Sequence, residues 1–215
     1  MLKQFYAVLF IILSSHVFAE QALPEAIAPI AHRWAQIYYQ VPDKDKATAY
    51  HQLLSDAEQV VKSHPSKAEP LVWEAIVLAS YAKAEGGLGA LGKAKQARDL
   101  LLAARKIDPY TLNGSIYTSL GSLYAKVPGW PIGFGDKKEA RLNLEKALQL
   151  NPTGIDANYF YADFLFEQGE YVKAAEYAKK AIAAPGRDGR EDADAGRRKE
   201  AEKLIIEIKR KSTTE

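Results

Sequence analysis

The chain has 215 residues, with 29 Lys and Arg against 27 Asp and Glu, and it contains no cysteine. The lack of cysteine excludes disulfides and thiolate metal sites, so an exported form must be held together by core packing. The near balance of charge, a formal net +2, gives no reason to expect nucleic acid or an anionic membrane as a partner.

Residues 1–19 have the layout of a cleavable secretory signal peptide. Lys3 precedes an apolar run from Phe5 to Leu13, and small residues lead to an expected cleavage after Ala19. The alternative is a membrane anchor, but about ten apolar residues are too few for a span of roughly 20. No cysteine follows the run, which excludes a lipoprotein anchor. We expect a periplasmic or secreted protein, with a Gram-negative periplasm as its compartment and no membrane insertion after signal removal.

Three later segments share a pattern of glycine, alanine and proline. In each, an alanine follows the glycine by five residues, a second alanine comes seven residues later, and a proline closes the segment. A glycine permits a tight turn, alanines seven apart share one helix face and allow close packing, and proline ends a helix. The pattern therefore predicts helical hairpins whose second helices occupy 92–109, 135–152 and 169–186.

The repeat places the whole mature chain, 20–215, in one helical-repeat domain. The expected parts are a degenerate first hairpin, three repeats and a capping helix, at 20–66, 67–109, 110–152, 153–188 and 191–211. In the last segment, Ala201, Leu204, Ile205 and Ile208 form one apolar stripe among charged residues. That stripe predicts a helix that covers the last hairpin and exposes a polar outer face, with an anionic partner site as the alternative.

Tyr117, Leu120, Gly121 and Tyr124 have the offsets of a W-x2-L-G-x2-Y pattern, with tyrosine in place of tryptophan. With the glycine–alanine–proline pattern, residues 67–186 resemble the tetratricopeptide repeat (TPR) family, and residues 24–65 resemble it loosely. The resemblance implies an all-α stack of about four antiparallel helical hairpins, a short right-handed solenoid with a concave groove. It also implies a non-enzymatic scaffold that binds a protein or peptide, here one of the cell envelope.

The signal peptide, the hairpins and the stretch from Trp130 to Leu165 also resemble uncharacterised periplasmic TPR proteins. More distantly, they resemble the T-component of tripartite periplasmic (TRAP) transporters. That second resemblance implies association with a solute-binding protein and a cleft that holds a small ligand. The T-component is typically a lipoprotein, and this chain lacks the lipid-accepting cysteine.

The TPR register places candidate partner-binding residues on the concave groove. Asp156, Tyr159, Asp163 and Phe166 share one face of the first helix of the last repeat, and the preceding repeat offers the smaller Thr118 and Ser122. An acidic and aromatic lining fits a basic or amphipathic peptide, or a small ligand. The alternatives are a plain solvated groove and acid–base catalysis, which would need carboxylates that are buried or closely coupled.

Two insertions are expected between the helices of consecutive hairpins, "AEGGLGAL" before Gly92 and "VPGWPIGF" before Gly135. Equivalent loops of a solenoid lie side by side and often form its binding edge. Trp130 and Phe134 supply large apolar surface there, for a partner or for packing back onto the hairpin. Asp136, which follows Gly135, is expected to cap the next helix.

Motifs for chemistry are lacking. Residues 87–94, "GLGALGKA", fit G-x-x-x-x-G-K, but Ala94 replaces the required Ser or Thr and the preceding residues predict a helix rather than a strand. The sequence has no H-E-x-x-H zinc motif and no G-x-S-x-G nucleophile turn. We therefore expect no enzyme activity, no cofactor and no metal.

Overall fold

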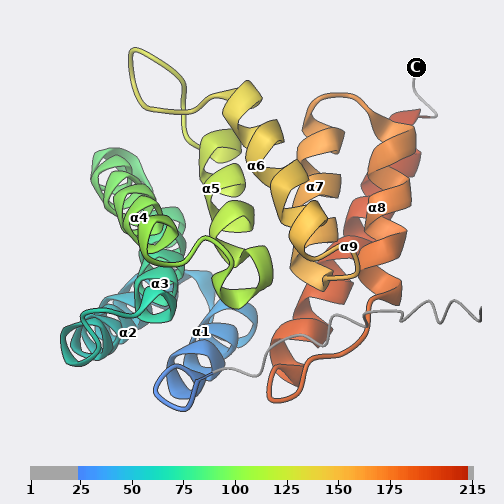
Figure 1. The fold of residues 1–215 in the computed structure, drawn as a ribbon. Coiled ribbons are helices and arrows are strands. Elements are labelled where there is room, and N and C mark those ends of the chain that lie inside the picture. Colours follow the sequence, from blue (N-terminus) through green and yellow to red (C-terminus); the bar gives the residue numbers. More distant parts are fainter. Residues whose placement is uncertain (1–23, 213–215) are drawn as a thin grey trace, which may run out of the picture.

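The computed structural model describes residues 24–212; the predicted signal peptide lies outside the described residues. Within that range the ordered elements are nine α-helices and one 3-10 turn (Figure 1). They are α1 Ala28–Gln40, α2 Asp43–Ser63, α3 Ala68–Glu85, α4 Gly87–Ile107, η1 Thr111–Gly114, α5 Ser115–Lys126, α6 Lys137–Leu150, α7 Ile155–Glu167, α8 Tyr171–Ala183 and α9 Glu191–Ser212.

Consecutive helices pair as antiparallel hairpins that stand side by side (Figure 1). The most extensive helix contacts are within the pairs α3–α4, α5–α6 and α7–α8. The predicted all-α stack of TPR-like hairpins is thereby confirmed.

Small residues at the predicted positions let the helices approach closely. The six repeated alanines are all fully buried, with 0% exposure: Ala97, Ala104, Ala140, Ala147, Ala174 and Ala181. Gly121 is equally constrained, since a Cβ there would lie 2.5 Å from Cγ of Leu144. The glycine of the L-G pair therefore marks the place where α5 and α6 meet without room for a side chain.

The turn between α3 and α4 differs from the prediction. Gly92 is inside α4, which begins at Gly87, so the "AEGGLGAL" insertion lengthens a helix instead of forming a loop. The turn is made by Gly86 and Gly87, whose φ angles of 64° and 65° favour glycine. Across this turn, Nζ of Lys93 lies 2.6 Å from Oε2 of Glu85 and ties the two helices together.

The predicted cap of α6 is confirmed, because the Asp136 carboxylate accepts hydrogen bonds from the backbone N–H of Lys138 (2.8 Å) and Glu139 (3.1 Å). Asp136→Ala is expected to lower the free energy of unfolding by about 1 kcal/mol, since both N–H groups lose their acceptor. Urea unfolding followed by circular dichroism measures this change. Asp136→Asn keeps a capping oxygen and is the control; an equal loss in both variants would contradict the capping role.

Helix α9 covers the last hairpin and also reaches the first helix. Ala201, Leu204 and Ile208 of the predicted stripe are buried, and α9 contacts α7, α8 and α1. Where it crosses α1, Gly196 lies against Tyr39 so closely that a Cβ would be 2.5 Å from three atoms of the ring. The C-terminal helix therefore packs against both the last hairpin and the first helix of the stack.

Candidate functional site

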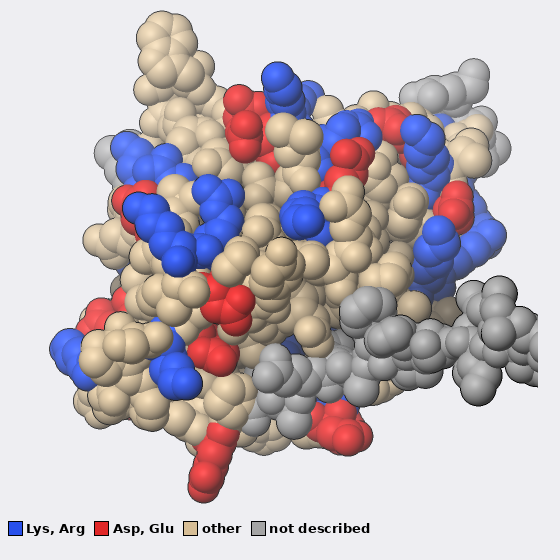
Figure 2. All heavy atoms as spheres, in the orientation of Figure 1, with Lys and Arg blue, Asp and Glu red and all other residues tan. Residues whose placement is uncertain are grey.

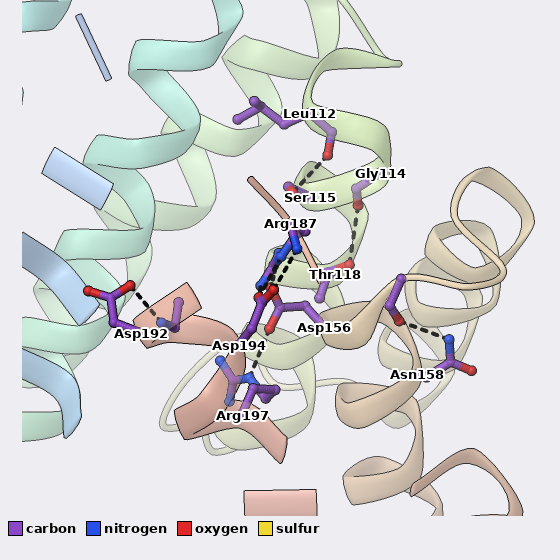
Figure 3. Close-up of polar contacts among 12 residues, drawn as sticks. Leu112, Gly114, Ser115, Thr118, Asp156, Asn158, Arg187, Asp192, Asp194 and Arg197 are labelled. Atoms are coloured by element: carbon purple, nitrogen blue, oxygen red, sulfur yellow. Dashed lines mark hydrogen bonds and ion pairs between the residues drawn. The ribbon is translucent and has the colours of Figure 1, made fainter. Parts of the chain in front are cut away.

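Asp156, predicted to line an open groove, is part of an ion-pair network between α7 and α9. Its carboxylate lies 2.8 Å from Nη1 of Arg187 and 2.8 Å from Nε of Arg197. Arg187 also donates from its backbone N–H and its Nε to the buried carboxylate of Asp194, both at 2.8 Å. Figure 3 shows these side chains pointing toward one another from the two helices and the segment between them. The network fixes α9 to α7, which corrects the expectation that Asp156 is available to a partner.

Arg187 and Arg197 keep the Asp156 carboxylate in its ionised form. Partial burial alone would raise the pKa of Asp156, but the guanidinium groups of Arg187 and Arg197 hold it well below its usual range. Burial would likewise lower the pKa of Arg197, while Asp156 raises it well above the ordinary value. Asp156 is therefore ionised near neutral pH and is unsuited to act as a general acid.

This low pKa makes the contribution of Asp156 to stability depend on pH. The side chain of an unfolded Asp has a pKa of about 3.9, and the pKa of Asp156 in the folded protein is lower. The stabilisation by Asp156 is therefore present above the unfolded pKa and is lost as the pH falls through the folded pKa. We expect the difference in unfolding free energy between wild type and Asp156→Asn to be constant from about pH 7 to 5 and to shrink between about pH 4 and 2. Urea unfolding at each pH measures it. Asp188→Asn, at an exposed site, is the control; a difference for Asp156→Asn that does not change with pH would contradict the assignment.

Tyr159 is also covered by α9. The Arg197 guanidinium carbon lies 4.7 Å from the centroid of the Tyr159 ring and 4.6 Å from that of Phe160. Arg197 is only 4% exposed, and its Nη1 donates to Oε2 of Glu200 at 2.6 Å. Glu200 in turn accepts hydrogen bonds from the hydroxyls of α1 (Tyr38 at 3.2 Å and Tyr39 at 3.3 Å). Arg197 thus links α9 to α7, and Glu200 links α9 to α1.

The acidic residues in the rest of the predicted groove share one lysine within the chain. Nζ of Lys126, the last residue of α5, lies 2.7 Å from Oδ2 of Asp163 and 2.5 Å from Oε1 of Glu167. Burial would lower the pKa of Lys126, but these two carboxylates raise it. Because Lys126 is shared between both acids, Asp163 is paired within the chain, while the three side chains together keep one negative charge in excess.

The three remaining groove candidates are also engaged or small. Phe166 packs against Tyr171, with ring centroids 5.7 Å apart. Thr118 is buried, and its hydroxyl donates to the carbonyl of Gly114 at 3.3 Å (Figure 3). Ser122 is half-buried on the same helix. The six predicted groove residues therefore do not form one open surface, and Thr118 is corrected to a buried position.

The α5–α6 loop, residues 127–136, is the candidate that stands out from the surface (Figures 1 and 2). Its backbone is ordered by internal hydrogen bonds, from N–H of Gly133 to O of Gly129 (3.1 Å) and from N–H of Gly135 to O of Pro128 (2.9 Å). A Cβ on Gly135 would lie 1.8 Å from O of Val127. The glycines thus allow two parts of the loop backbone to approach closely, and the internal hydrogen bonds give the loop a defined conformation.

The two aromatic residues of this loop have different surroundings. Phe134 packs back onto the hairpin, 5.7 Å from the ring of Tyr124 and 4.5 Å from the guanidinium of Arg98 on α4. Trp130 is 90% exposed, and its neighbour Ile132 is 68% exposed. Of the two predicted loop contacts, Phe134 supports the loop and Trp130 remains accessible.

Sequence reasoning missed Arg187, Arg197, Glu200 and Gly196. The arginines and Glu200 belong to a strongly charged stretch, and such a composition is typical of a solvated helix face. Gly196 did give a signal, since a glycine inside a helix costs about 1 kcal/mol and calls for a packing reason. Within residues 24–212, no three side chains of the metal-binding types are grouped as an ion would require. None of the described helices combines the length and apolar character of a membrane span.

Part of the sequence matches the model of one known protein family. Residues 132–190 match the tetratricopeptide repeat family model, and no curated protein matches the sequence. The crystal structure of a thermophilic TPR protein from Thermus thermophilus is similar at 17% identity and a TM-score of 0.45, over 83% of this chain and 99% of that one. Residues 132–136 of the α5–α6 loop, α6, α7 and α8 lie in the matched segment, and Trp130 lies just before it. Residues 132–190 therefore match a tetratricopeptide repeat, within a described chain whose helices form a TPR-like stack of hairpins.

Proposed function

We propose that this protein is exported to the cell envelope and acts there as a non-enzymatic scaffold that binds a protein partner. The TPR architecture supports a protein–protein interaction role in general. The signal-like residues 1–19 support the compartment. The exposure of Trp130, on a loop whose backbone is held by its own hydrogen bonds, is the observation that carries the choice of surface.

The partner contacts the tip of the α5–α6 loop rather than the α7 face. Trp130 and Ile132 offer an apolar surface without any charged residue between Val127 and Gly135. A tryptophan that is solvent-exposed in the free protein gains most when a partner pocket covers it, as tryptophans at interface hot spots do. On the α7 face, Asp156 and Tyr159 are already occupied by Arg197. We infer that the partner is an envelope protein or peptide with an apolar pocket for the indole ring.

The test is recovery of a partner from the periplasm with a Trp130→Ser/Ile132→Ser variant. We expect at least a tenfold loss of the crosslinked or copurified partner, because a hot-spot residue contributes about 2 kcal/mol or more. Val172→Ser, which removes an isolated side chain on α8 that is 87% exposed, is the matched control and should keep the partner. Equal recovery with both variants would rule out the loop as the contact surface.

Export is tested separately by the mass of the protein purified from the periplasm. Cleavage after Ala19 predicts a mature chain that begins at Glu20. A full-length cytoplasmic product would overturn the proposed compartment without affecting the loop assignment.

A second candidate is an accessory protein of a TRAP-type transporter that holds a small ligand or binds a solute-binding protein. The observation in its favour is a cavity of about 800 Å³ between the N-terminal helices and α9. Copurification with a solute-binding protein encoded beside this chain would support it. Absence of any such neighbouring gene would argue against it.

A further inference from the structure

The cavity between α1, α2, α3 and α9 has the size of a small-molecule site. Its volume of about 800 Å³ is within the range of about 300–1,000 Å³ that is usual for ligand pockets. It exists because α9 returns to α1, with Gly196 and Glu200 of α9 forming part of the wall. The cavity does not involve the α5–α6 loop, so it is independent of the proposed scaffold surface.

Tyrosines give the cavity an aromatic wall. Tyr38 and Tyr39 pack edge to face, 4.8 Å between ring centroids, and both line the space. Tyr50 lines it from α2, is only 1% exposed, and has Ser80 as the hydrogen-bonding neighbour of its hydroxyl. The neighbouring Ser80 hydroxyl is already bonded to Trp34 and to the carbonyl of Ile76, each at 2.8 Å. Burial raises the pKa of Tyr50, although its hydrogen bond with Ser80 lowers it, so the hydroxyl remains protonated.

Four lysines and three carboxylates line the same cavity, and two of the carboxylates are paired within the chain. Asp43 lies 2.8 Å from Nζ of Lys46. Glu200 is bound by Arg197 at 2.6 Å. The third, Asp192, has His32 at 2.9 Å. Asp43 is thus neutralised by a lysine of the lining, Glu200 shares Arg197 with Asp156, and Asp192 pairs with a histidine.

The other three lysines have no carboxylate partner among the described residues: Lys83, Lys199 and Lys203. Lys83 donates to the hydroxyl of Tyr38 at 3.2 Å. Lys199 and Lys203 are four residues apart on α9 and therefore share one face of that helix. Four lysines against three carboxylates leave the lining with a formal excess of one positive charge. That excess favours a ligand with at least one negative charge.

We propose that this cavity binds a small organic anion, a compound with a phosphate or carboxylate group on a planar or apolar body. Lys83, Lys199 and Lys203 bind the acidic group by charge-assisted hydrogen bonds. The rings of Tyr38 and Tyr39 cover the body, and Tyr50 forms the wall on the side of α2. Because the lysines are exposed, the affinity depends on ionic strength.

The test uses 1-naphthyl phosphate as the probe and uncharged 1-naphthol as its matched neutral analogue, each titrated into the full mature protein by calorimetry. We expect the phosphate to bind and the naphthol to bind at least tenfold more weakly, since it lacks the group that the lysines hold. Lys199→Gln/Lys203→Gln should weaken binding of the phosphate about fivefold to tenfold. Lys95→Gln/Lys179→Gln removes the same charge from exposed positions outside the cavity and should leave binding unchanged.

Each other result overturns the proposal. Absence of binding by 1-naphthyl phosphate, or equal binding of the two probes, would show that the cavity does not select anions. Equal weakening by both lysine pairs would show that only the overall charge matters. Loss of probe binding in a Trp130→Ser variant would place the probe at the loop and not in the cavity, which keeps a failed partner capture and a failed titration distinguishable. A Glu-rich peptide that competes with the probe and binds more tightly would replace the small molecule with an acidic protein segment.

Discussion

Replacing Arg197 by methionine is expected to lower the free energy of unfolding by about 3 kcal/mol or more. The side chain is 4% exposed and bridges Asp156 and Glu200. Removing one member of a buried ion pair leaves its partner charge without compensation, which costs about 3–5 kcal/mol in proteins. Arg187 still pairs with Asp156, which places the effect at the lower end of that range. Urea denaturation at neutral pH measures the change.

Arg33→Met is the matched control for this prediction. Arg33 is an exposed residue of α1, and its hydrogen bond to Gln36 (3.2 Å) is made three residues away on the same helix. Its replacement should change stability by no more than about 0.5 kcal/mol. A loss for Arg197→Met as small as that for Arg33→Met would contradict the role of Arg197 in holding α9 to α7.

Gly196→Ala is expected to destabilise the protein by about 1–3 kcal/mol, although alanine is the better helix former. In an exposed helix the substitution gains about 1 kcal/mol. Here the new Cβ would lie 2.5 Å from the Tyr39 ring, which is held in place by Tyr38 and by the bond to Glu200. Overpacking of this kind costs about 1–3 kcal/mol or more, so the clash outweighs the gain in propensity. Thermal or urea unfolding gives the sign directly.

The same substitution at Gly92 provides the control with the opposite sign. Gly92 is inside α4, and a Cβ there would meet nothing within 4 Å. Gly92→Ala should therefore stabilise the protein by about 0.5–1 kcal/mol. If both variants were stabilised, α9 would not approach α1 as closely as described.

The local features of the fold could be predicted from the sequence because they depend on short-range patterns. The buried alanines of the repeat and the cap at Asp136 follow from helix periodicity and capping chemistry. The α3–α4 turn could not be predicted in the same way. Glycine-rich residues 86–92 are typical of a loop, yet the helix begins at Gly87, where the Lys93–Glu85 pair joins its first turns to α3.

The predicted groove shows the limit of such patterns more clearly. Asp156 and Tyr159 lie on α7, as the sequence predicts. Their contact is Arg197, which follows Asp156 by 41 residues on a helix whose charged residues predict exposure to solvent. Contacts between elements far apart in the sequence depend on how the stack closes, and neither composition nor periodicity contains that information. The same closure creates the cavity between α1 and α9, whose place and lining residues no sequence pattern indicated.

Photo-crosslinking tests the central claim most directly, namely that the partner meets the α5–α6 loop while α9 occupies the α7 face. A photoreactive p-benzoylphenylalanine would replace Trp130 in one variant and Tyr159 in another, with irradiation in intact cells. We predict a crosslink to a second protein from position 130 and a crosslink within the chain, to α9, from position 159. A second protein captured from position 159 and none from position 130 would contradict the account.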